Sequence, residues 1–80
     1  MNRYEAKFSM NCPNDDEDIA YTLIIESDSM LMVERINGII EHASPRDFHE
    51  ELATYFHGEL GGSQRLTATH QGVIITTVRQ

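Results

Sequence analysis

The stretch SPRDFHEELATYFHGELGG, residues 44–62, contains the most strongly predicted helix of this chain. Ser44 is a favourable N-cap, Pro45 suits the first helical position, and Asp47 lies where a carboxylate stabilises the positive end of the helix dipole. Apolar residues recur on one helical face, and these are Phe48, Leu52, Tyr55, Phe56 and Leu60. The pair Gly61-Gly62 then ends the pattern. The stretch therefore predicts a helix over residues 45–60 with one buried face.

Two segments before this helix alternate between polar and apolar residues, which is typical of half-buried strands. In residues 3–10 the apolar positions are Tyr4, Ala6, Phe8 and Met10. Residues 18–26, DIAYTLIIE, predict a second strand. Because Ile24 lies opposite the other apolar residues of that strand, we expect both of its faces to be covered.

The remaining segments complete the pattern. Residues 30–43 predict a helix, in which Val33, Ile36, Ile39, Ile40 and Ala43 share a face, although residues 30–33 are also compatible with an extended segment. After the second helix, RLTAT and VIITTV predict a hairpin with its turn at His70-Gln71-Gly72. The order ββααββ predicts one α+β domain over residues 1–80, with a four-stranded antiparallel sheet and both helices on one face. Its free edges and open face favour self-association into a closed ring or barrel.

Composition narrows the classes of partner. The chain has 80 residues with 13 acidic and 6 basic side chains, which gives a formal net charge of −7. This charge repels phosphate backbones and anionic membrane surfaces, so we expect neither nucleic acid nor a membrane as partner. The first ten residues alternate in polarity and do not resemble a signal peptide, and no apolar run approaches the roughly 20 residues that cross a bilayer. With a single cysteine and no export signal, we expect a cytoplasmic protein.

Five residues are candidates for a functional site. Cys12 follows the first strand in a loop, where a thiolate could act as a nucleophile, and Asp18 could exchange a proton with it. His49 and Glu50 open the predicted second helix, and a carboxylate there could accept two N–H donors from a heterocycle. Glu34 lies near the start of the first helix. A buried, unreactive thiol for Cys12 and a helix-stabilising role for Glu50 are the alternatives.

The histidines and the single cysteine show no zinc-binding spacing, so no metal site is predicted.

The fragments that contain these residues, in this order, resemble the 7-cyano-7-deazaguanine reductase family in its short, single-domain form. The matching pieces are Cys12-Pro13 after the first strand, Asp18-Ile19-Ala20, Val33-Glu34 and Phe48-His49-Glu50. The last hairpin is similar to that of tunnelling-fold enzymes, including GTP cyclohydrolase I. The resemblance implies a tunnelling fold, oligomeric assembly with sites between subunits, and a place in the queuosine pathway of transfer RNA modification.

The resemblance also implies a role for each candidate. Cys12 would attack the nitrile carbon and form a thioimide, Asp18 would handle the proton, and His49 would lie near the reacting carbon. Glu34 and Glu50 would hold the edge of the deazaguanine. NADPH would be the reductant, but the family's lysine-rich motif after the first glutamate is replaced here by Arg35-Ile36-Asn37-Gly38.

The sequence is therefore compatible with three functions. The first is an enzyme that acts on a 7-deazaguanine nitrile through Cys12. The second is a non-catalytic oligomer that binds a purine or pterin and needs Glu50 but not Cys12, which the missing lysines favour. The third is a small interaction protein in which the motif matches are accidental.

Overall fold

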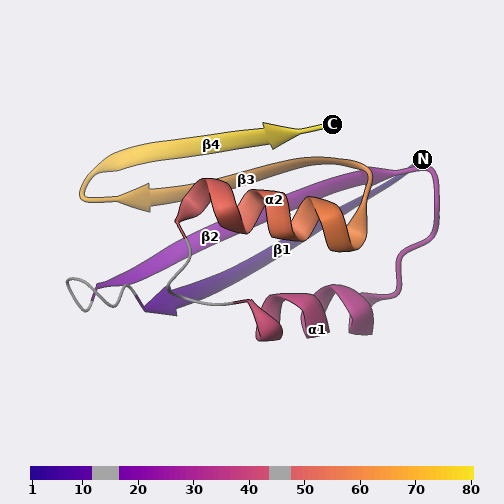
Figure 1. Ribbon diagram of the computed structural model, residues 1–80, viewed down its shortest axis with the longest axis horizontal. Coiled ribbons are helices and arrows are strands. Elements are labelled where there is room, and N and C mark those ends of the chain that lie inside the picture. Colours follow the sequence, from indigo (N-terminus) through magenta and orange to yellow (C-terminus); the bar gives the residue numbers. More distant parts are fainter. Residues whose placement is uncertain (12–16, 44–47) are drawn as a thin grey trace.

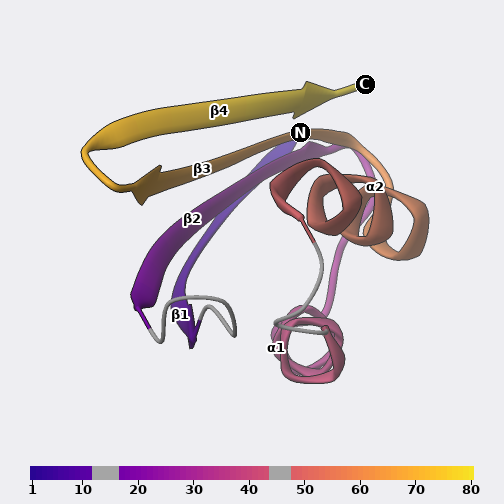
Figure 2. The same ribbon diagram turned by 60° about the vertical axis from the view of Figure 1, so that its left-hand side comes forward.

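The computed structural model of the protein describes residues 1–11, 17–43 and 48–80. In chain order, these residues form β1 (Asn2–Asn11), β2 (Asp18–Ser27), α1 (Val33–His42), α2 (His49–Leu60), β3 (Ser63–His70) and β4 (Val73–Arg79). The strands make one sheet in the order β1-β2-β3-β4, and each neighbouring pair is antiparallel. Both helices lie on the same side of the curved sheet (Figure 1, Figure 2). The predicted α+β class and the ββααββ order are confirmed.

The core lies between the sheet and α2. Alternation in β2 turns every second side chain towards the helices, so that Ile19, Tyr21, Leu23 and Ile25 are all buried. The largest fully buried side chains are Phe56, Leu23, Ile25, Leu52 and Leu66. On the other face of β2, Ile24 is only half-buried, and no helix among the described residues covers that face. Two covered faces for β2 are therefore not found within one chain.

Helix α1 begins later than predicted. Met32 has an extended backbone with ψ of 133°, so the helix starts at Val33 rather than at residue 30, and the extended alternative for this segment is found up to Met32. A tertiary contact explains the difference: the backbone N–H of Leu31 donates a 2.9 Å hydrogen bond to the hydroxyl of Tyr4 on β1. This bond fixes the segment before α1 against the sheet in a non-helical path. Only Ile36 of α1 is buried, and Val33 is 59% exposed.

Helix α2 also begins later than predicted. Phe48 has an extended backbone with ψ of 159° and is the N-cap residue, which makes no side-chain cap hydrogen bond. The predicted cap at Ser44, with Pro45 and Asp47 in the first turn, is therefore wrong for this helix, and residues 44–47 themselves lie outside the described residues. Phe48 is 73% exposed and does not belong to the buried face. The helix starts at His49, whose ring contacts β3, so packing on the sheet overrides the local capping signal.

Two glycine-containing turns close the C-terminal half. Gly61 caps α2, its N–H donating to the carbonyl of His57, and Gly61 and Gly62 both have positive φ, as the predicted helix end requires. The β3–β4 hairpin is tighter than predicted, since His70 pairs with Val73 within the sheet. The turn consists of Gln71 and Gly72, with φ of 51° and 80°, and two positive values are typical of a type I′ turn.

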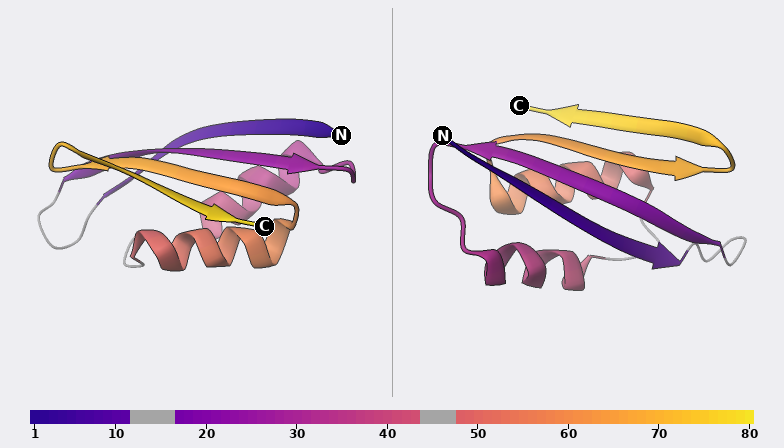
Figure 3. Two further views of the ribbon diagram at one scale, coloured as in Figure 1. Left: turned by 90° about the horizontal axis from the view of Figure 1, so that it is seen from above. Right: turned by 180° about the vertical axis from the view of Figure 1, so that it is seen from behind.

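The outer strands of the sheet are β1 and β4 (Figure 3). β1 has a neighbouring strand on one side only. A groove of about 400 Å³ lies between β1 and α1. The residues along this groove are Tyr4, Glu5, Ala6, Lys7 and Phe8 of β1 and Val33, Ile36, Asn37, Ile40 and Glu41 of α1.

Candidate functional site

His49 is the most closely held of the candidate residues. As the first residue of α2, it reaches the sheet, where Nε2 lies 2.9 Å from the carbonyl oxygen of Leu66 on β3. A carbonyl only accepts, so Nε2 carries the hydrogen of this bond. The other ring nitrogen, Nδ1, is buried and has no hydrogen-bond partner among the described residues. In the neutral ring that nitrogen is an acceptor, and it is the one uncommitted polar atom of this side chain.

An aromatic row supports the His49 ring. The ring stacks on Tyr21 of β2 with centroids 6.0 Å apart, and Tyr21 in turn stacks on Phe8 of β1 at 5.2 Å. Phe8 meets Phe56 of α2 edge-on at 5.8 Å. These contacts join two strands to α2, at its first residue through His49 and in its third turn through Phe56, and an aromatic pair contributes roughly 0.5–1.5 kcal/mol beyond its buried area. They set the position of His49 over β2.

Asp18 lies at the start of β2, three residues before Tyr21. Its carboxylate is exposed and accepts a 3.3 Å hydrogen bond from the side-chain amide of Asn11, with which it is also paired across β1 and β2. Cys12 follows Asn11 directly in the sequence and lies outside the described residues. The carboxylate of Asp18 is therefore bonded to the residue that directly precedes the candidate nucleophile in the sequence.

Glu50 and Glu34 occupy different ends of the molecule. Glu50 is the second residue of α2 and is exposed, and its backbone carbonyl accepts a 3.5 Å hydrogen bond from Arg79 of β4. Glu34 is exposed in the first turn of α1. The start of α1 lies at the end of the sheet opposite to the starts of β2 and α2 (Figure 1). One chain thus brings Asp18, His49 and Glu50 to one end, and it leaves Glu34 at the other.

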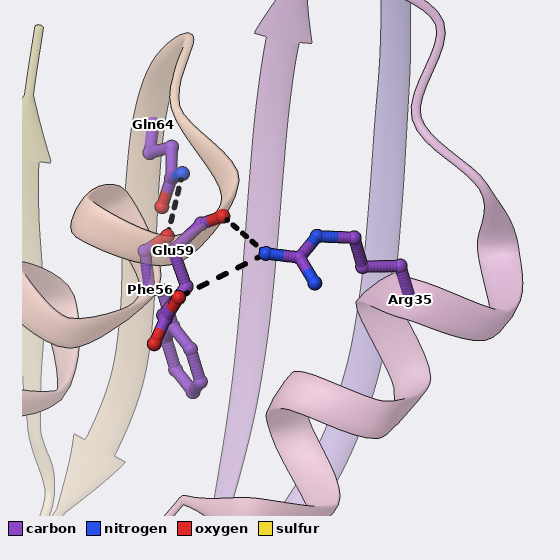
Figure 4. A network of polar contacts seen from close by, with 4 residues as sticks. All are labelled: Arg35, Phe56, Glu59 and Gln64. Atoms are coloured by element: carbon purple, nitrogen blue, oxygen red, sulfur yellow. Dashed lines mark hydrogen bonds and ion pairs between the residues drawn. The ribbon is translucent and has the colours of Figure 1, made fainter.

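Arg35 is occupied by a contact between the two helices. Its Nη2 donates a 3.1 Å hydrogen bond to the backbone carbonyl of Glu59 and lies 3.8 Å from the Glu59 carboxylate (Figure 4). Arg35 is the one cation among residues 34–38, and in the structure its guanidinium is directed to Glu59 of α2.

Sequence reasoning did not identify Tyr21 and Arg79 as neighbours of the site. Tyr21 is a buried residue of β2, and only the packing of α2 shows that it supports His49. Arg79 contacts the Thr54 hydroxyl at 3.3 Å and the Glu50 carbonyl, so it fixes the first two turns of α2 against β4. Its position as the last residue of an edge strand gave no sequence signal for this role.

Comparisons with protein-family models, with curated proteins and with solved structures found no match for this chain. Across the described ranges 1–11, 17–43 and 48–80, no three His, Cys, Asp or Glu side chains cluster in a way that could hold a metal ion. Neither of the two helices in these ranges is long and apolar enough to cross a membrane.

Proposed function

We propose that this chain binds a flat nitrogen heterocycle at the shared end of β2 and α2, and that it acts on a 7-deazaguanine nitrile through Cys12. The observation that carries the proposal is the stack of His49 on Tyr21, which holds the start of α2 over the start of β2. This stack brings Glu50 to the same end of the molecule as Asp18, because α2 and β2 both begin there.

The proposed step is the addition of a thiol to a nitrile. The Cys12 sulfur bonds to the nitrile carbon, one π bond of the C≡N group breaks, and the thiol proton ends on the nitrogen by way of Asp18. The product is a thioimide whose mass equals protein plus ligand. This step needs no electron donor and releases no leaving group, so it can be tested without a reductant. Glu50 would hold the heterocycle by accepting hydrogen bonds from its N–H groups.

Glu34 belongs to this site only if a second copy of the chain supplies it. Within one chain, α1 begins at the end of the sheet that lies away from Asp18 and His49. A homo-oligomer in which the site forms between subunits is therefore part of the proposal.

A non-catalytic purine- or pterin-binding oligomer is the second candidate. It is favoured by the pairing of Arg35 with Glu59, because this pairing leaves the start of α1 without a free cation for a nicotinamide dinucleotide. Such a protein would need Glu50 but would not need Cys12. A small interaction protein without a bound heterocycle is the third.

Intact-protein mass spectrometry after incubation with 7-cyano-7-deazaguanine separates these functions. The enzyme requires an adduct with the full mass of the ligand, and the adduct must be absent from Cys12→Ala. The binding protein requires no adduct but a higher melting temperature with a purine or pterin, which Glu50→Gln abolishes. Folded protein that shows neither effect would refute both and leave an interaction protein.

A further inference from the structure

The free edge of β1 is the longer of the two unpaired strand edges in the described part of the chain. β1 has ten residues, and only β2 pairs with it. Unpaired N–H and C=O groups along such an edge are a template for another strand. What could pair with it depends on the side chains that the strand presents on its two faces.

These side chains are self-complementary about Ala6. The strand reads RYEAKFS over residues 3–9, so that Glu5 and Lys7 flank Ala6 on both sides, and Tyr4 and Phe8 flank those. We propose that β1 pairs with β1 of a second copy in an antiparallel manner, with a two-fold axis through Ala6. Such an axis is compatible with an antiparallel ladder, because both its hydrogen-bonded and its non-hydrogen-bonded residue pairs are symmetric. A two-fold interface uses the same surface on both subunits.

On the open face of the sheet, this pairing joins opposite charges twice. Glu5 of each copy lies directly across from Lys7 of the other. In the single chain both side chains are solvated, at 40% and 75% exposure, and Glu5 lies 3.9 Å from Lys7 and 3.5 Å from Arg3 of its own strand. A lone edge lysine would oppose strand addition, but here the symmetric position holds a glutamate. Opposite charges directly across an antiparallel pair are stabilising.

On the helix face, the same pairing places Tyr4 across from Phe8 of the second copy, twice. Both aromatic side chains are half-buried and border the groove of about 400 Å³ between β1 and α1. Helix α1 is itself incompletely covered, since Ile36 is its one buried residue and Val33 is 59% exposed. Ile39 and Ile40 already pack against the core of their own chain, so what the pairing can cover on α1 is its side along the groove and the exposed Val33. Ala6 at the axis leaves room for this close approach.

The other free edge, β4, matches β1 less well. Its residues on the open face are Ile74, Thr76 and Val78, as the register with β3 shows. None of these three carries a charge, so β4 of a second copy would leave Glu5 and Lys7 unmatched. The charges therefore favour pairing of β1 with itself, which yields an eight-stranded sheet with β4 at both ends.

The two-fold axis also reverses the direction of α1 in the second copy. The Glu34 end of that helix then lies at the end of the assembly that holds Asp18 and His49 of the first copy. This consequence rests on the proposed function, whereas the pairing of β1 rests only on the edge, the charges and the groove.

Exchange of the two charges tests the pairing in solution. Glu5→Lys and Lys7→Glu each place like charges across both pairs, and we expect each to weaken dimerisation at least about tenfold. The double variant Glu5→Lys/Lys7→Glu restores opposite charges and should restore the dimer. Both positions are exposed, so circular dichroism should show the same fold in all four proteins. Light scattering over a concentration series measures the dissociation constants, and a monomeric parent at 100 μM would overturn the proposal.

A cross-link locates the axis. In a Cys12→Ser background, Ala6→Cys places two thiols directly across the axis, where the Cα separation of roughly 4.5–5.5 Å in an antiparallel pair suits a disulfide. We expect a disulfide-linked dimer under mild oxidation. Ser9→Cys is the matched control, because the two thiols would then lie roughly 20 Å apart along the strands. Equal cross-linking at both positions, or dimerisation that neither charge exchange changes, would overturn this register even if the protein forms an adduct with the nitrile.

Discussion

The hydroxyl of Tyr4 on β1 accepts a 2.9 Å hydrogen bond from the backbone N–H of Leu31, which lies 27 residues further along the chain. This bond links the outer strand to the segment that leads into α1, and it is partly buried. It supplements the apolar packing of α1, in which Ile36 is buried and Ile39 and Ile40 are half-buried against the core.

We expect Tyr4→Phe to lower the free energy of unfolding by about 1 kcal/mol, because it removes this bond, together with an exposed 3.2 Å bond from the Asn2 side-chain amide, and keeps the aromatic packing. Urea unfolding followed by circular dichroism measures the change. Tyr55→Phe is the control: Tyr55 is also half-buried, but its hydroxyl bonds to no other described residue. A loss as large in the control as in Tyr4→Phe would contradict the role given to the Tyr4 hydroxyl.

Two glycines should respond to alanine in opposite directions. Gly62 has φ of 74°, and a Cβ there would lie 2.6 Å from the backbone oxygen of Glu26, so we expect Gly62→Ala to destabilise the protein by at least about 2 kcal/mol. Gly58 lies inside α2 with nothing within 4 Å of an added Cβ, so Gly58→Ala should stabilise by up to about 1 kcal/mol. Thermal unfolding of both variants beside the parent checks the two signs. A stable Gly62→Ala variant would show that the chain can move away from Glu26.

The strand faces were predictable because alternation is a local property. Successive side chains of a strand point to opposite faces, so the alternation in β2 identifies its inward residues, such as Leu23. The order of the elements then predicts that the helices cover that face. The helix starts were predictable only in part, because the sequence left an extended path open before α1 but favoured a start of α2 four residues too early. Met32 is extended and follows Leu31, whose backbone N–H bonds to the Tyr4 hydroxyl. Phe48 is extended and precedes His49, whose ring bonds to the Leu66 carbonyl. Both partners are distant in the sequence. Capping rules consider only the residues at a helix end, so they cannot predict the effect of contacts with distant residues.

For the candidate residues, the sequence showed their order along the chain but not their arrangement in space. The order of Asp18, His49 and Glu50 could be seen in the sequence, but which of them share an end of the molecule depends on the path of the helices. Nothing local placed Glu34 at the opposite end, and nothing local showed that Arg35 would pair with Glu59.

His49 should contribute to stability as well as to the site. We expect His49→Ala to lower the free energy of unfolding by about 2 kcal/mol, because it removes the Nε2–H donor to the Leu66 carbonyl and takes the ring away from Tyr21. His49→Gln keeps an N–H donor at a similar reach and should recover about half of that loss. Urea unfolding of both variants tests this order. His42→Gln serves as the control, because His42 is exposed and its hydrogen bond within the described ranges is to Gly38 of its own helix, so its effect should stay within about 0.5 kcal/mol.

Gln64 holds the end of α2 from within the core. It is 3% exposed, and its amide nitrogen donates to the carbonyls of Phe56 at 3.1 Å and Gly61 at 2.7 Å, the first of which appears in Figure 4. Both acceptors lack hydrogens to donate, so the position requires a donor.

Gln64→Glu should therefore make the stability depend on pH. Burial and the two facing oxygens would raise the pKa of the introduced carboxyl above the value of about 4.3 that it has in an unfolded chain. Because the folded-state pKa is the higher one, the stability of this variant is fully present below the unfolded pKa and is lost as the pH rises through the folded pKa. We expect the variant to approach the parent at pH 4 and to be at least about 3 kcal/mol less stable at pH 7, measured by urea unfolding of both proteins at each pH. Gln64→Leu, which cannot ionise, should show the same deficit at both pH values. A pH-independent deficit in Gln64→Glu would mean that the carboxyl reaches water, and that the end of α2 opens more easily than its buried hydrogen bonds imply.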